Sequence, residues 1–409
     1  MPEVETRVES ADGAAPEVRA WYVVGVATWF LSFGLSGVIV PALVTQVLQA
    51  GGGSLALVQM SNQAPSMLLI LFGGAIADRV DRRALLIGLY LVGAALTAAL
   101  ALGVEQGRLS IPLVIAYGLG MGTLSAFVIP ARDALLSEVW GANLMRAVGV
   151  LTLTQWGMQA VGNFGASLQK LVGFAPLIAL QAGVLLAGVP AFAQLPRRVR
   201  VPVAQRPKVS LAELGSGIVE VARSRELRPV ALLAVALGMF FIGPFLVVFP
   251  MIVRDVYHGG TGELGVFIGC FPIGVIVGSL ALLARGGLHR KGVAQLAALA
   301  VGALCMGVLG LGLPFPVALA ANFAFGAGGS VFMTASRTIF QERANPATRG
   351  RVLSVYSLAT MVSGGVLGST VAGTLVVHVG PLQTCLFSAV AMAAIVSLSA
   401  RLTPIASLK

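Results

Sequence analysis

The chain has 409 residues, of which 57% are hydrophobic and only 11% carry a charge. Its mean hydropathy is +0.92. Soluble domains contain about a quarter charged residues, so this composition excludes a soluble globular fold and predicts lipid as the main solvent. The net charge of +11 would suggest nucleic acid in a soluble protein. Here the basic residues lie in short loops between apolar runs, so we expect no nucleic-acid partner.

Residues 1–20 are acidic, with Glu3, Glu5 and Glu9 near the start. A signal peptide begins with positive charge and an apolar core, so this segment is not one. It predicts a disordered cytoplasmic tail. The apolar run that begins at Trp21 is long enough to cross a bilayer, which takes about 20 residues.

Twelve apolar runs follow in two sets of six. The runs lie near 21–46, 54–76, 84–103, 110–131, 147–171 and 174–195, and then near 229–253, 261–284, 293–313, 315–337, 352–377 and 379–401. Each is long enough for a transmembrane helix. The pattern therefore predicts an all-α membrane protein with one six-helix bundle over 21–195, a second over 229–401, and a short cytoplasmic tail over 402–409.

The interval 196–228 between the two sets is the longest loop and is basic. Ser210 and Glu213 have the spacing of a capping box at a helix N-terminus. After them, apolar side chains recur on one helical face at Leu211, Leu214, Ile218 and Val221. The linker therefore contains either an amphipathic helix on the inner membrane surface or a solvated stretch.

The distribution of charge predicts the orientation. With both termini inside, only Arg108, Lys170 and Arg254 of the 27 basic residues fall on the outside. Basic residues concentrate in cytoplasmic loops. We therefore expect a multi-pass protein of the cell inner membrane with both ends in the cytoplasm.

The two halves share internal similarity. The fourth run contains YGLGMGTLSAFVIPARDALLSE, from Tyr117 to Glu138, and the tenth contains FGAGGSVFMTASRTIFQE, from Phe325 to Glu342. Both have an aromatic residue, a glycine cluster, and a charged exit with a glutamate. Glycines within apolar spans favour close helix packing over nucleotide binding. Repeated halves around a central site are typical of secondary transporters.

A motif joins the second and third runs: GGAIADRVDRRALL, from Gly73 to Leu86. It resembles the signature loop of the major facilitator superfamily, and the matching positions are Gly74, Asp78, Arg79, Arg82 and Arg83. The chain departs from the family pattern at Asp81, where glycine is usual. With the twelve spans, the repeat and the basic linker, the resemblance covers nearly the whole chain. It implies two pseudo-symmetric six-helix bundles, alternating access, and a monomer without a cofactor or metal.

The resemblance also implies a gate at the cytoplasmic mouth. The family pattern places the signature loop against the start of span eleven, here Arg349, Gly350 and Arg351. We predict that Asp78 faces that helix end and an arginine such as Arg132. Asp133 and Glu138 lie nearby at the inner surface. The alternative is that these charges only set the topology.

Polar side chains within the spans predict a central cavity. They concentrate in the first, second, fifth and tenth spans, whereas spans three, six, nine and twelve have almost no amides. The candidates are Thr28, Ser32, Ser36, Gln59, Asn62, Gln63, Gln155, Gln159, Asn163 and Asn322, with Phe241 and Phe245 as apolar partners. Amides with large apolar groups suit an amphiphilic ligand. The alternative is hydrogen bonding between helices.

The sequence leaves the coupling ion open. No carboxylate lies at the centre of a predicted span, so Asp133 and Glu263 are the candidates for carrying a proton. Two family features are altered: Ala116 replaces an arginine of span four, and Gly162-Asn163 replaces the Gly-Pro of the antiporter motif. These departures weigh against proton antiport in particular.

A finer resemblance predicts the direction of transport. IPARDALLSEVWGANLMRAVGV after span four and NPATRGRVLSVYSL before span eleven resemble a branch that includes enterobactin, macrolide and other drug exporters. The predicted activity is export of a small hydrophobic or amphiphilic molecule: a drug, a siderophore or a secondary metabolite. An importer or a flippase for lipids or lysolipids is the alternative within transport. A membrane receptor or scaffold is the alternative outside it.

Overall fold

A computed structural model describes the chain except for residues 1–14, 78, 142–143, 197–210, 346–347 and 409. The described residues form helices and short connections, and no strand occurs among them. Lipid offers no hydrogen-bond partners to a polypeptide backbone, and a helix satisfies those groups within one segment.

Six helical segments form the N-terminal half. They are α1 (Pro16–Ala42) continued by η1 (Leu43–Val47), α2 (Gly52–Ala77), α3 (Arg82–Glu105), α4 (Ile111–Trp140), α5 (Leu144–Gly165) continued by η2 (Ala166–Leu168) and α6 (Gln169–Val172), and α7 (Phe174–Ala193). The element α8 (Leu211–Arg223) follows before the second half.

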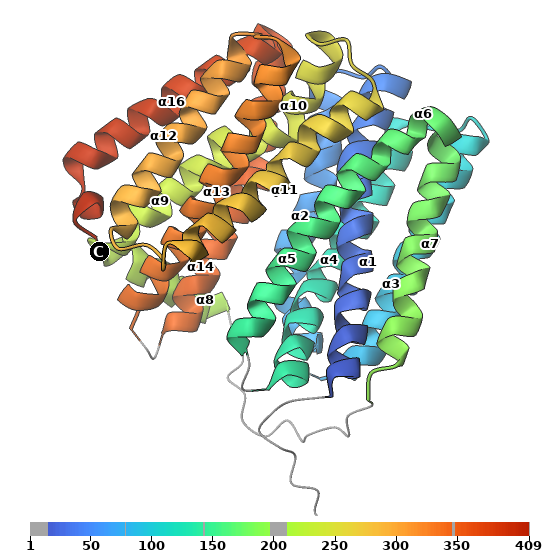
Figure 1. Cartoon of the computed structure of the whole chain (residues 1–409), viewed down its shortest axis with the longest axis horizontal. Helices are drawn as coiled ribbons and strands as arrows, with labels where there is room; N and C mark the ends of the chain where they lie inside the picture. Colours follow the sequence, from blue (N-terminus) through green and yellow to red (C-terminus); the bar gives the residue numbers. More distant parts are fainter. Residues whose placement is uncertain (1–14, 78, 142–143, 197–210, 346–347, 409) are drawn as a thin grey trace, which may run out of the picture.

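Six more segments form the C-terminal half, which lies beside the first (Figure 1). They are α9 (Leu227–Leu237) continued by η3 (Gly238–Ile242) and α10 (Gly243–Asp255), α11 (Thr261–Ala284), α12 (Lys291–Gly310), α13 (Phe315–Arg343), α14 (Arg349–Met361) continued by η4 (Val362–Gly368) and α15 (Ser369–Val379), and α16 (Pro381–Leu402). A short turn, η5 (Pro404–Ser407), ends the described chain.

Ten of the segments in the described part are long and apolar enough to cross a membrane. The other two, α2 and α5, have 26 and 22 residues, which at 1.5 Å per residue also suffices for a span. The predicted fold class, an all-helical membrane protein with two six-helix bundles, is confirmed.

Glycines allow the helices to approach closely in both halves. A side chain at Gly122 of α4 would collide with the backbone of Asn62 in α2, and one at Gly326 of α13 would collide with the backbone of Phe271 in α11. These are the glycine clusters of the internal repeat, and each packs its span against an equivalent neighbour. Close helix packing is the use that small residues have in membranes.

Described residues at both ends of the chain have regular structure or packing within the predicted tails. Helix α1 begins at Pro16, within the predicted tail, because proline is favourable in the first helical turn. At the other end, Ile405 and Leu408 are buried, and the Gly292 N–H donates to the Leu408 carbonyl at 3.1 Å. These contacts fold residues 404–408 back onto the start of α12, within the stretch 402–409 that was predicted as a cytoplasmic tail.

The linker contains a helix, α8, where the sequence left an amphipathic helix and a solvated stretch as alternatives. In α8, Val221 is buried, while Ile218 is half exposed. Val221 clusters with Val352 and Val355 of α14, and Gly217 lies against the backbone of Arg351. The helix therefore packs on the start of α14. Ser210 lies outside the described residues, so its capping role stays a prediction.

Candidate functional site

A cavity of about 130 Å³ lies between the two halves. Helices α1, α2, α4 and α5 form one wall, and α10 and α11 form the other. The polar residues of the first wall are Ser32, Ser36, Gln59, Asn62, Gln63, Tyr117, Ser125, Gln159 and Asn163, whereas the second wall consists of Phe245, Leu246, Pro250 and Ile268. The lining residues are uncharged. The polar side chains all lie on the first wall, among the apolar residues Trp29, Phe33, Val40, Pro41, Val58 and Met121, whereas the second wall is apolar throughout.

A buried amide supports the polar wall from behind. Gln181 of α7 is 1% exposed, and its Nε2 lies 3.2 Å from the hydroxyl oxygens of both Ser32 and Tyr117. The hydroxyls of Ser36 and Tyr117 are 3.4 Å apart. Because a hydroxyl can donate or accept, this network holds the side chains of α1 and α4 in place while leaving them able to bind a ligand.

One hydrogen bond crosses the cavity from the polar wall to the apolar wall. The Gln59 Nε2 donates to the Leu246 carbonyl at 3.0 Å. In a regular helix that carbonyl would accept from the residue four positions later, which is Pro250. Proline has no N–H. Pro250 therefore frees the carbonyl of Leu246 for a partner in the opposite half.

Aromatic side chains stiffen the apolar wall. Phe245 packs against Phe249 and Phe271 with ring centroids 5.2 and 5.0 Å apart. Trp156 of α5 reaches Phe271 from the other half, at 5.9 Å. Such offset and edge contacts stabilise a wall beyond simple area burial.

The structure brings eight of the twelve predicted cavity residues to this site. They are Ser32, Ser36, Gln59, Asn62, Gln63, Gln159, Asn163 and Phe245. Their role in binding stays a prediction.

The other four predicted residues are not among the lining residues. Thr28 donates to the Gly25 carbonyl at 2.8 Å within its own helix, and Phe241 is buried against Phe325. Asn322 is fully buried and donates to the Phe267 carbonyl at 2.5 Å. Gln155 lies one helical turn from Gln159 but does not line the cavity. The position of a residue along its helix did not distinguish side chains that point into the cavity from side chains that point toward a neighbouring helix.

Three polar residues at the site, Tyr117, Ser125 and Gln181, were not predicted from the sequence as cavity residues. Tyr117 is the aromatic residue that precedes the glycine cluster of span four, and Gln181 lies in span six, one of the spans with almost no amides. A hydroxyl or amide group within an apolar run could have indicated these residues, because buried hydroxyls and amides require hydrogen-bond partners.

The ends of the molecule differ in how the halves meet. We call the end at which α7 ends (Ala193) and α8 begins (Leu211) the linker end, and the opposite end the far end. The ribbons of the two halves lie close at the far end and diverge toward the linker end (Figure 1).

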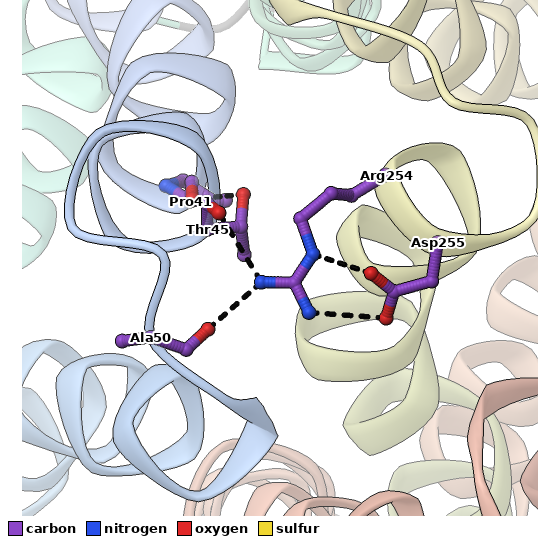
Figure 2. A network of polar contacts seen from close by, with 5 residues as sticks. All are labelled: Pro41, Thr45, Ala50, Arg254 and Asp255. Atoms are coloured by element: carbon purple, nitrogen blue, oxygen red, sulfur yellow. Dashed lines mark hydrogen bonds and ion pairs between the residues drawn. The ribbon is translucent and has the colours of Figure 1, made fainter.

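Arg254 joins the halves at the far end (Figure 2). Its Nη1 donates to the carbonyls of Thr45 and Ala50 at 3.1 and 2.9 Å. Asp255 holds the guanidinium from the other side, with Oδ1 at 2.5 Å and Oδ2 at 3.1 Å. Cations are favourable near the carbonyls that end a helix, so α10 caps the end of the first span.

A second pair of contacts joins the halves nearby. The Lys170 Nζ lies 2.6 Å from the Glu263 carboxylate, and the Thr261 hydroxyl donates to the Gln46 side chain at 2.8 Å. Glu263 also accepts from the Gly260 N–H at 2.8 Å. This candidate proton carrier is thus in an ion pair at the far end, outside the cavity.

At the linker end, the described ion pairs each join elements of one half. Arg82 pairs with Glu138 inside the N-terminal half. Lys291 pairs with Glu342 at 2.8 Å, and Arg343 with Glu226 at 3.3 Å, in the C-terminal half. Each of these three pairs therefore stabilises one half of the molecule at the linker end.

The predicted gate is only partly described. Arg83 donates to the Ala193 carbonyl, and Arg79 is exposed. A side chain at Gly74 would meet nothing within 4 Å. Asp78 lies outside the described residues, so its contact with the start of span eleven stays a prediction.

The remaining gate residues lie on two helices. Arg132 is buried, sits 5.1 Å from the ring centroid of Phe30, and contacts the Asp133 carboxylate at 2.8 Å. Arg132 was predicted to face Asp78, and the partner that the structure describes for it is Asp133. Asp133 also lies outside the cavity. Arg349 and Gly350 are exposed at the start of α14, and Arg351 is partly buried there.

Comparison with known proteins identifies the fold. Residues 22–369 match the family model of the Major Facilitator Superfamily. No curated protein matches the chain.

Three solved structures share this architecture at low sequence identity. A mutant of the nucleoside transporter NupG has a TM-score of 0.77 at 12% identity, over 93% of this chain and 98% of its own. A bacterial homolog of the human lysosomal transporter Spinster, inward-facing and unoccupied, has 0.68 at 12%, over 96% of each chain. The human organic anion transporter MFSD10 has 0.65 at 18%, over 94% and 99%. The chain therefore belongs to the Major Facilitator Superfamily and is a non-enzymatic, multi-pass secondary transporter.

Proposed function

We propose that this carrier exports a small, uncharged amphiphilic molecule across the cell inner membrane. The observation that supports this is the two-sided cavity, with uncharged hydrogen-bonding groups facing Phe245, Leu246 and Ile268. A binding site of few placed polar groups within an apolar surround selects a ligand with the same division. A charged substrate would leave its charge unpaired there, at a high cost in desolvation.

The neighbours' names agree with part of this proposal. NupG is named as a nucleoside transporter. A nucleoside is uncharged and combines a polar sugar with a flat base. An organic anion, which MFSD10 is named for, would call for a cation, and the cavity lining has none.

The proposal includes alternating access with both termini in the cytoplasm. Basic residues favour the cytoplasmic side, which makes the linker end the inner end. Arg254, Lys170 and Glu263 close the outer end in this conformation. The conformation is then inward-facing, and export requires these outer contacts to break after the substrate is bound.

The test is uptake into inverted membrane vesicles, where export appears as accumulation. Radiolabelled chloramphenicol is the neutral amphiphilic probe, and tetraphenylphosphonium and benzoate are the charged comparators. We expect uptake of chloramphenicol alone, because only an uncharged probe matches the lining. Running the assay with and without a pH gradient tests proton antiport.

A matched pair of variants ties uptake to the cavity. Gln159→Leu removes a lining amide, whereas Gln194→Leu removes an exposed one. A hydrogen bond contributes about 1 kcal/mol, so Gln159→Leu should lower uptake about fivefold and Gln194→Leu should not. Uptake of a charged comparator, accumulation only in right-side-out vesicles, or no uptake of any probe would overturn the proposal.

A further inference from the structure

Asn163 differs from the other polar residues of the cavity. It lines the cavity and is 1% exposed. Both its Nδ2 and its Oδ1 are buried, and neither has a hydrogen-bond partner. Buried amides in proteins almost always have partners. An amide with both its donor and its acceptor unsatisfied, at the wall of a cavity, points to a ligand that supplies both.

The backbone holds this amide in place. A side chain at Gly162 would collide with the backbone of Leu31 and Leu35 in α1, so α5 packs directly on that helix. On the other side, the Asn163 carbonyl lies where a side chain on Gly265 of α11 would stand, 2.5 Å from that Cβ position. Three helices therefore meet at Asn163. A residue held this way loses little entropy when a ligand binds, which favours recognition.

The chemistry of an amide defines its partner. The side chain of asparagine presents an oxygen acceptor and an N–H donor side by side. A ligand meets both when it has a donor and an acceptor next to each other on one edge, as asparagine pairs with adenine. Primary amides, lactams and cyclic imides have such an edge. Esters, ethers and N-alkylated lactams lack the donor.

We infer that Asn163 recognises an uncharged lactam, primary amide or cyclic imide edge of the substrate through paired hydrogen bonds. This inference rests on the proposed function and names the polar part of its amphiphilic substrate. The apolar wall at Phe245 and Ile268 faces the rest of the ligand. A flat apolar ring fused to a lactam combines both features.

The experiment measures binding to the purified full-length protein by calorimetry. The probes are 2-quinolinone, a flat lactam, and its N-methyl derivative, which keeps the ring and the carbonyl but has no N–H. Sites built to hydrogen-bond a ligand strongly reject analogues without that group. We expect 2-quinolinone to bind at least about tenfold more tightly, although the methyl group alone would strengthen apolar binding.

Variants identify Asn163 as the source of that difference. Asn163→Leu should lose the preference for 2-quinolinone and bind the N-methyl probe at least as tightly, because only the apolar contribution of the methyl group remains. Its binding of the N-methyl probe shows that it is folded. Gln194→Leu, which removes an exposed amide, should keep the preference. Equal or tighter binding of the N-methyl probe to the unaltered protein, as expected if Asn163 only holds an ordered water, would overturn the inference.

Four further results bear differently on this inference and on the proposed function. A preference that survives in Asn163→Leu, or no binding of 2-quinolinone at all, would also overturn the inference. Selective lactam binding without any vesicle uptake would contradict only the proposed function. Uptake of chloramphenicol without lactam selectivity would contradict only the inference.

Discussion

Gln59 and Pro250 show how a proline within a helix allows a hydrogen bond between the two halves. Pro250 leaves the Leu246 carbonyl without its helical partner, and the Gln59 side chain donates to that carbonyl from 3.0 Å. An unpaired carbonyl in lipid or in an apolar wall is costly. The hydrogen bond thus stabilises the contact of α2 with α10 in this conformation.

A double-mutant cycle tests this dependence. Gln59→Leu should lower stability by about 0.6 kcal/mol, the average for a hydrogen bond between membrane helices. In a Pro250→Ala background the residue at 250 regains its N–H, so the helix satisfies the Leu246 carbonyl and Gln59→Leu should cost nothing. The measurement is unfolding in sodium dodecyl sulfate. An equal cost in both backgrounds would mean that Pro250 plays no part.

Helix α5 contains one glycine that is in close contact with another helix and one that is not. A side chain at Gly162 would overlap the backbone of α1, whereas one at Gly157, one and a half turns earlier, would meet nothing within 4 Å. Small residues that let backbones touch are a main source of helix association in membranes. The position of Asn163 and Gln159 in the cavity wall follows from this contact.

Replacing these two glycines by alanine should separate the effects. Overpacking a tight contact costs about 1–3 kcal/mol, so Gly162→Ala should lower the thermal midpoint of the purified protein. Gly157→Ala adds the same methyl group to the same helix in open space and serves as the control. Similar midpoints for the two variants would show that α1 and α5 separate at low cost.

At the scale of elements, hydropathy and charge predicted most of the fold. Long apolar runs predict spans because lipid admits few alternatives. The spacing of apolar residues in the linker left an amphipathic helix and a solvated stretch as alternatives. The packing of Ile405 and Leu408 onto α12 was not predictable, because two apolar residues in a short tail are too few to show a helical or strand periodicity. The amides predicted the region of the cavity, but Asn322 and Thr28 share the same pattern and point elsewhere.

The whole molecule is asymmetric along its long helices. At the far end, Arg254 and the Lys170–Glu263 pair cross between the halves. At the linker end, Arg82–Glu138 and Lys291–Glu342 stay within one half. When the free energies of two conformations differ by only a few kcal/mol, a small number of such contacts changes the populations of the two conformations. The far-end contacts therefore favour the conformation described here.

Arg254→Gln should shift the carrier toward a form that is open at the far end. The substitution removes the charge and the planar fork that together bridge Asp255 to the carbonyls of Thr45 and Ala50. Exposed ion pairs contribute little, but the Arg254 side chain is only 26% exposed and donates to two helix-end carbonyls. A shift of about 1 kcal/mol changes the ratio of the two forms about fivefold.

Distances between spin labels at Gln106 and Leu311 report on the far end. Both residues are exposed at the ends of helices in opposite halves, and the labels require a background without Cys270, Cys305 and Cys385. Arg254→Gln should broaden the distance distribution toward longer values, whereas Arg108→Gln, an exposed arginine of a far-end loop, should leave it unchanged. The Arg254 contacts and the Lys170–Glu263 ion pair both join the two halves at the far end. An unchanged distribution for Arg254→Gln would therefore show that the Lys170–Glu263 pair keeps this end closed without Arg254.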